Sequence, residues 1–193
     1  MLKPIMNRDE AWTLLTEYTK GDSLRKHALA VEAAVRGYAR KFGADEEAWG
    51  IAALLHDFDY ERWPTLGDHP FKGSEILRER GYPEWLIRAI QSHATEITGV
   101  TRESPLEKTL FACDEMAGFV TAAALIRPSK SVLDLEPTSV VRRMKDKAFA
   151  RAVKREDLHA GAALLGLPLE EHIGHVIAFM RERADELGLR GTL

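Results

Sequence analysis

The chain has a single cysteine, Cys113, among its 193 residues. One thiol cannot form a disulfide within the chain, and it cannot build the multi-cysteine cage of a structural zinc site. An excess of positive charge is also missing, because 27 Lys and Arg side chains face 30 Asp and Glu, for a net charge of -3. The composition therefore disfavours a nucleic-acid partner or an anionic membrane surface.

Long uncharged runs are absent as well. No stretch reaches the ~18 apolar residues that a membrane-spanning helix requires. The first twelve residues carry several charges and lack the apolar centre of a signal peptide. We therefore expect a cytoplasmic protein. A length of 193 residues suits one domain, taken here as residues 1–193.

No segment alternates polar and apolar residues with the period of a β-strand, so the predicted fold class is all-α. Helix stop and start signals support this interpretation. The sequence SPLE at 104–107 combines a serine cap, a proline at the first helical position and a glutamate three residues after the cap. The expected helices cover residues 8–19, 24–42, 45–57, 70–80, 83–95, 105–126, 138–153, 156–165 and 168–187.

The stretch LLHDFDYERWPTLGDHP, at 54–70, brings many titratable groups to the end of an apolar segment. Burial of an unpaired carboxylate costs several kcal/mol, so these groups need compensation. A divalent cation is the simplest source of it, with neutral imidazoles and carboxylates as ligands.

Helical spacing places further candidate ligands on inward faces. His27 shares a helix face with the apolar residues Val31 and Ala34. The same spacing of three or four residues places His56, His93 and Asp114 on the apolar, inward faces of their own helices. Each has an ordinary alternative, since a lone buried histidine is more often a core residue and a lone aspartate is often a cap or an ion-pair partner. Taken together, they are better explained by one shared ion.

The pattern of His27, the adjacent pair His56-Asp57 and the distant Asp114 resembles the signature of the HD superfamily of metal-dependent phosphohydrolases. The resemblance runs from about residue 22 to 122. It implies an all-α, HD-domain-like helical bundle in which these four residues bind a divalent metal. The residues from 130 to 193 then form a C-terminal helical extension that packs on this core.

The stretch 69–94 resembles HD members that hold two metals. That likeness implies a second ion bound by His69 and His93, with Asp57 bridging. The chain departs from the HD-GYP subgroup, because Ser23 replaces a glutamate, His93 stands alone rather than paired, and the usual lysine after the His-Asp pair is missing. Cleavage of cyclic dinucleotides is therefore disfavoured.

The expected chemistry follows from nitrogen and oxygen ligands without sulfur. Such a set favours Mn, Fe(II), Co, Ni or Mg over structural zinc, with one or two ions bound. The metal-activated hydroxide would attack phosphorus. Asp57 and Asp59 are the predicted catalytic residues, and Asp59 is placed as the donor or relay of a proton to the leaving group. An ordinary loop carboxylate that accepts a backbone hydrogen bond is the alternative for Asp59.

The negative charge of a phosphoester substrate also needs positively charged side chains to bind it. Arg25 and Lys26 precede His27, and Lys72 begins the helix that follows His69, where a helix N-terminus favours anions. These three residues are therefore candidate substrate contacts.

A strongly basic segment covers residues 142–155, with seven basic residues and one acidic. Lys145 and Lys147 are further candidate substrate contacts, although a solvated helix face explains the segment at least as well. The pair His172 and His175 has chelating spacing, but an ordinary helix surface is the favoured interpretation.

The predicted function is hydrolysis of a phosphomonoester or phosphodiester in a small molecule, with a nucleotide as the favoured class. Two alternatives stay open: an HD-type di-iron oxygenase, and a regulatory module that binds metal or nucleotide without turnover. A direct role with nucleic acid or membranes is disfavoured. Trp12, Trp63 and Trp85 are candidate anchors of a homo-oligomer interface.

Overall fold

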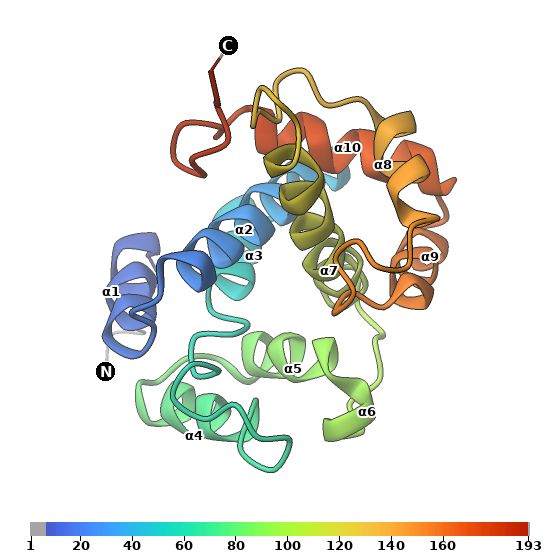
Figure 1. Ribbon diagram of the computed structural model, residues 1–193. Helices are drawn as coiled ribbons and strands as arrows, with labels where there is room; N and C mark the ends of the chain where they lie inside the picture. The colour runs from blue at the N-terminus through green and yellow to red at the C-terminus, as the bar shows by residue number, and fades with distance from the viewer. Residues whose placement is uncertain (1–6, 193) are drawn as a thin grey trace.

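The computed structural model describes residues 7–192, and Figure 1 shows their path. Residues 1–6, on which the expected absence of a signal peptide partly rests, lie outside the described residues, as does residue 193. The helices are α1 (Arg8–Tyr18), α2 (Asp22–Phe42), α3 (Glu46–Leu54), α4 (Phe71–Glu79), α5 (Glu84–His93), α6 (Thr95–Thr98), α7 (Pro105–Leu125), α8 (Pro137–Met144), α9 (Arg155–Leu164) and α10 (Leu169–Arg181). Residues 7–192 contain no β-strand, so the predicted all-α class is confirmed.

Two helices of 21 residues each, α2 and α7, form the centre of the fold. Helix α3 packs on α2, α5 and α9 pack on α7, and α10 contacts both central helices. In Figure 1, α4, α5 and α6 lie together below this centre, α8 and α9 lie to its right, and α10 runs across the top. The core consists of apolar side chains from all of these layers, such as Val31, Leu54 and Phe119.

The local signals in the sequence act as expected at the ends of the central helices. Ser104 accepts a hydrogen bond from the Glu107 amide, and the Glu107 carboxylate accepts one from the Ser104 amide in return, which completes a capping box. Gly43 ends α2 in the left-handed conformation, at φ 64°, where a side chain would be strained.

The predicted helix 138–153 is too long, because α8 ends at Met144. Residues 145–154 form a loop, and several carbonyl oxygens of this loop accept hydrogen bonds from the side chain of Arg155. The guanidinium of Arg155 donates to the carbonyl oxygens of Ala150 and Val153 at 3.0 and 2.8 Å, and it lies over the ring of Phe119. One of the seven basic residues therefore holds the loop against α7.

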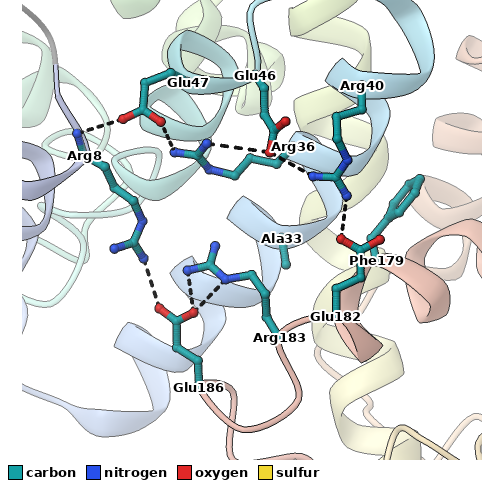
Figure 2. Close-up of a pocket in the computed structure, with 10 residues that line it drawn as sticks. All are labelled: Arg8, Ala33, Arg36, Arg40, Glu46, Glu47, Phe179, Glu182, Arg183 and Glu186. Carbon is teal, nitrogen blue, oxygen red and sulfur yellow. Dashed lines mark hydrogen bonds and ion pairs between the residues drawn. The ribbon is translucent and has the colours of Figure 1, made fainter.

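A polar pocket of about 460 Å³ lies beside α2 and is drawn in Figure 2. At 100° per residue, Arg36 lies on the face of α2 opposite His27. The arginines that line this pocket form ion pairs with glutamates, for example Arg36 with Glu47 at 2.7 Å and Arg40 with Glu182 at 2.6 Å. These ion pairs bind neighbouring elements to one another rather than providing free positive charge.

Beneath this pocket, the fully buried carboxylate of Glu32 accepts charge-assisted hydrogen bonds from Arg8 and Arg36 and pairs with Arg183. Burial by itself raises the pKa of Glu32, but these guanidiniums outweigh it and hold the pKa below its usual value. The cluster ties α1 and the segment after α10 to the middle of α2. Within the described part of the chain, no helix is both long and apolar enough to cross a membrane.

Candidate metal centre

Six imidazole and carboxylate side chains converge between the central helices and the α4–α5 end of the fold. They come from α2, from the turn after α3, from the residue before the α4 cap, from the last residue of α5 and from the middle of α7. In each group the candidate ligand atoms lie within 4.8 Å of one another: the first is His27, His56 and Asp114, and the second is Asp57, His69 and His93.

In the first group, two imidazoles face one carboxylate oxygen. His27 Nε2 lies 3.0 Å from Asp114 Oδ1, and His56 Nε2 lies 3.4 Å from the same atom. Among the described residues, His56 Nε2 is a buried polar atom without a hydrogen-bond partner. A buried nitrogen lone pair with no donor nearby is the feature that a metal ion would satisfy.

In the second group, two imidazoles face Asp57. Asp57 Oδ1 lies 3.3 Å from His69 Nε2 and 3.4 Å from His93 Nε2, and these two nitrogens are 3.3 Å apart. The other oxygen, Asp57 Oδ2, lies 3.4 Å from His56 Nε2 in the first group. Asp57 therefore presents one oxygen to each group, which is the arrangement of a bridging carboxylate.

Two of the imidazoles are held toward the site by hydrogen bonds on their outer nitrogens. His56 Nδ1 donates to the Ala53 carbonyl at 2.7 Å, and His93 Nδ1 donates to the Ile90 carbonyl. Each acceptor lies three residues earlier, at the end of a helix where carbonyls have no helical partner. Because Nδ1 carries the proton in this assignment, the Nε2 lone pair faces the site.

The charges of the site favour bound cations. Burial lowers the pKa of His56, but the carboxylates of Asp57 and Asp114 outweigh it and hold the pKa well above its usual value. The same balance holds the pKa of Asp57 and of Asp114 below the usual range, because the facing imidazoles outweigh the effect of burial. A divalent ion would take the place of these protons, since metal ligands must be deprotonated.

The residues present therefore fit a divalent metal. Their nitrogen and oxygen atoms suit Mn, Fe(II), Co, Ni or Mg. His27, His56 and Asp114 would hold one ion and His69 and His93 a second, with Asp57 between them. The structure brings together all six residues that the sequence singled out as ligands.

Asp59, the predicted proton donor, does not lie where a donor to the leaving group is expected. Its side chain is buried, and its two oxygens accept hydrogen bonds from His69 Nδ1 at 2.8 Å and the Gly73 amide at 2.7 Å. It lies behind His69, on the side of the ring away from Asp57. Both oxygens are occupied by protein donors, so the geometry does not favour proton transfer to a leaving group.

The three cations near the signature are engaged elsewhere. Arg25 donates to the Thr19 carbonyl at 2.8 Å, Lys26 pairs with Asp22 at 2.7 Å, and Lys72 pairs with Glu75 at 3.0 Å. Each of these bonds is local to the end of a helix. Their predicted contact with substrate stays a prediction.

Lys145 and Lys147 are exposed in the loop after α8. The neighbouring Arg142 and Arg143 line a pocket with Ala123 of α7 and with residues 126–128, which follow that helix. Ala123 lies nine residues beyond Asp114, which is about 14 Å along a helix. The basic segment thus adjoins the last turn of α7 and, through Phe149 and Arg155, also the ring of Phe119 nearer the middle of that helix. The predicted role of Lys145 and Lys147 in phosphate binding stays a prediction.

The prediction for His172 was wrong, because this side chain is fully buried rather than on a helix surface. His172 Nε2 donates to the Ala112 carbonyl at 2.9 Å, and Nδ1 accepts from the Tyr38 hydroxyl at 2.6 Å. Burial lowers the pKa of His172 to about 4, so the ring is neutral at physiological pH. It links α10 to α2 and α7.

Two further residues at the site were not found from the sequence. Burial, and then the charge of Asp114, raises the pKa of the half-buried Glu115 to about 7. The guanidinium of Arg102 donates to the His93 carbonyl at 3.1 Å and stacks on the ring of Phe111. Arg102 lies in a connection between helices, where no periodicity could have marked it.

Comparison with known families agrees with this geometry. The model of the HD domain matches residues 24–118, a segment that contains all six candidate ligands and ends before α8 to α10. Residues 24–118 are therefore similar to an HD domain. HD domains are typical of metal-dependent phosphohydrolases, and they bind divalent metals through such histidine and aspartate clusters.

Among curated proteins, the chain is similar to Ribonuclease Y of Petrotoga mobilis (strain DSM 10674 / SJ95), with 27% identity over 140 residues. The matched segment covers 70% of this chain and 26% of that protein, so the chain spans about a quarter of the length of this relative. No solved structure matches the chain significantly.

Proposed function

We propose that this protein is a metal-dependent phosphohydrolase that cleaves a phosphomonoester or phosphodiester bond in a small molecule, with a nucleotide as the favoured substrate class. The observation that carries the proposal is the position of Asp57, whose two oxygens face two separate groups of ligands at 3.3 to 3.4 Å. Two-metal sites of this kind clamp the attacking and leaving oxygens of a displacement at phosphorus.

The division of labour follows from the positions of the side chains. When bound, the divalent ions supply a water of lowered pKa and polarise a phosphoryl oxygen. The neutral ligands of these ions would be the imidazole nitrogens of His27, His56, His69 and His93. The anionic ligands would be the carboxylates of Asp57 and Asp114. Asp57 also fixes the separation between the two groups because it belongs to both.

The phosphoester class is supported by the family and by the relative, whose name describes an enzyme that acts on RNA. RNA is a phosphodiester, so it is a necessary test substrate. The net charge of -3 still favours a small molecule over a polyanion.

The experiment begins with chelated protein reconstituted separately with Mn²⁺, Fe²⁺, Co²⁺, Ni²⁺ and Mg²⁺. A panel of aryl phosphomonoesters and phosphodiesters, nucleoside monophosphates, cyclic nucleotides and an RNA oligonucleotide is then screened for phosphate or alcohol release. We expect metal-dependent turnover of at least one small phosphoester. Metal content is measured by elemental analysis.

His56→Ala and Asp57→Ala remove ligands and should lower turnover by more than the ~10–100-fold that the loss of a supporting residue typically costs. His159→Ala is the matched control, because His159 is exposed on α9. Unchanged metal content and turnover in the two ligand variants would overturn the proposal. Oxygen uptake by the iron form would favour the oxygenase, and tight nucleotide binding without turnover would favour the regulatory module.

A further inference from the structure

Asp59 is a buried carboxylate that binds two parts of the second ligand group together. Its side chain is only 1% exposed. Oδ1 accepts from His69 Nδ1 at 2.8 Å, and Oδ2 accepts from the Gly73 amide at 2.7 Å in the first turn of α4. The carboxylate thus connects the loop after Asp57 to the helix that follows His69.

This arrangement distinguishes His69 from His56 and His93. His56 and His93 donate their Nδ1 protons to backbone carbonyls, whereas His69 donates to a carboxylate. A carboxylate partner fixes the tautomer and ring orientation and makes the opposite nitrogen a stronger donor to a metal. That nitrogen, His69 Nε2, is the one that faces Asp57 and His93.

The backbone at Gly73 is fitted to the same carboxylate. A Cβ added there would lie 2.8 Å from both Cγ and Oδ2 of Asp59 and 3.0 Å from the ring of Phe58. Real Cβ atoms do not approach other atoms so closely, so any side chain at this position would displace Asp59. Gly73 permits the close approach of its amide to Oδ2.

We propose that Asp59 is a positioning residue for the second cation: it holds His69 Nε2 toward Asp57 and His93, so that retention of the second ion, but not the first, depends on it. The inference rests on the metal binding in the proposed function and does not depend on which substrate is cleaved. It replaces the role of proton donor that the sequence suggested for Asp59.

Asp59→Asn tests the proposal with little change in shape. Asparagine offers one acceptor oxygen, so its NH₂ group must face either the Gly73 amide or the His69 Nδ1 proton, and one of the two bonds is lost. Titration of the chelated protein with Mn²⁺, followed by calorimetry, should show two equivalents for the wild type. In Asp59→Asn we expect unchanged affinity for one equivalent and a ~10–100-fold weaker second.

Reference variants assign the equivalents. His69→Ala should lose the same equivalent as Asp59→Asn, and His27→Ala should lose the other. Glu75→Gln removes one negative charge from the exposed side of α4 and should bind both equivalents normally. Gly73→Ala retains the Asp59 carboxylate but displaces it, so it should reproduce the selective loss if Asp59→Asn does not fold.

The melting temperature of the chelated variants reports any general destabilisation of the fold. General destabilisation would weaken the binding of both equivalents, whereas the positioning role weakens one equivalent and spares the other. Wild-type affinity for both equivalents in Asp59→Asn and Gly73→Ala would overturn the proposal, as would a wild type that binds fewer than two ions. A protein that shows the selective loss but hydrolyses no phosphoester would refute the proposed function and leave this inference standing.

Discussion

At the scale of single residues, the chain contains several buried polar side chains with opposite electrostatic roles. The imidazoles of the candidate metal centre face carboxylates and attract positive charge. His172 faces a hydroxyl and a carbonyl, and its burial excludes a proton instead. The same residue type therefore serves a cation site in one place and a neutral core in another.

His172 gives a pH dependence whose sign can be worked out. Its pKa is about 4 in the folded protein and about 6.5 when unfolded, so between these values the unfolded chain binds more protons. The stabilisation is fully present above pH 6.5 and is lost as pH falls, by about 2 kcal/mol at pH 5. Urea unfolding of chelated wild type and His172→Gln at pH 7.5 and 5 measures the difference.

His172→Gln should show a weaker loss of stability between these two pH values than the wild type, because it has no proton to take up. His159→Gln, at an exposed position, should retain the wild-type dependence. Identical pH dependence in wild type and His172→Gln would contradict the assignment.

At the scale of helices, the candidate metal centre depends on how closely α9 approaches α7. A Cβ added at Gly161 of α9 would lie 2.7 Å from the Cα of Ala112, which is backbone and cannot rotate away. Ala112 also accepts the hydrogen bond from His172 and lies two residues before Asp114. Packing between these helices therefore sets the position of a candidate ligand.

Gly161→Ala should accordingly reduce the free energy of unfolding by about 1–3 kcal/mol through overpacking. It should also weaken Mn²⁺ binding, because α7 shifts at the turn before Asp114. Gly174→Ala is the matched control in α10, since a Cβ there would meet only Pro137 at 3.5 Å. That control should gain up to about 1 kcal/mol from helix propensity. Equal stability of the two variants, by urea unfolding, would argue against this account.

Helix-level features were predictable where the signal was local. The SPLE cap and the inward positions of His27 and Asp114 depend on neighbours within one or two turns, and the structure agrees with them. The early end of α8 was not predictable, because the loop after it is held by Arg155, which donates to the carbonyl of Met144 and lies over the ring of Phe119 on α7. The burial of His172 likewise depends on α2 and α7, which are remote in sequence.

The site shows the same division between local and distant causes. His56 and Asp57 could be placed by their position after an apolar run, and the family resemblance assigned His69 and His93 to a second ion. The position of Asp59 behind His69 could not be predicted in this way, because it depends on the path of the whole loop and on the start of α4. No spacing rule distinguishes a carboxylate that faces a metal from one that supports a ligand.

At the scale of the whole molecule, the candidate ligands come from elements that are otherwise held together by apolar packing. His27 lies on α2, Asp114 on α7 and His93 on α5. An ion bound by them would cross-link these helices in the folded state, and the unfolded chain would offer no such site. Metal binding should therefore add directly to the stability of the fold.

At a Mn²⁺ concentration 100 times the dissociation constant, the added stability is about 2.7 kcal/mol, which corresponds to an increase of about 5–11 °C in melting temperature for a chain of this size. His56→Ala should abolish most of this shift. Scanning fluorimetry of chelated protein with and without Mn²⁺ at pH 8 measures it, with His159→Ala as the control.

The shift should be smaller at pH 6 than at pH 8, because protons compete with the metal. Burial lowers the pKa of His69, but hydrogen bonds to Asp57 and Asp59 outweigh this effect and raise the pKa to about 9 in the metal-free protein. Below that pH the ring holds a proton that must leave before Nε2 can bind a cation, and each further unit of acidity makes this exchange less favourable. A metal-induced shift that is independent of pH, or one retained in His56→Ala, would place the ion outside this cluster.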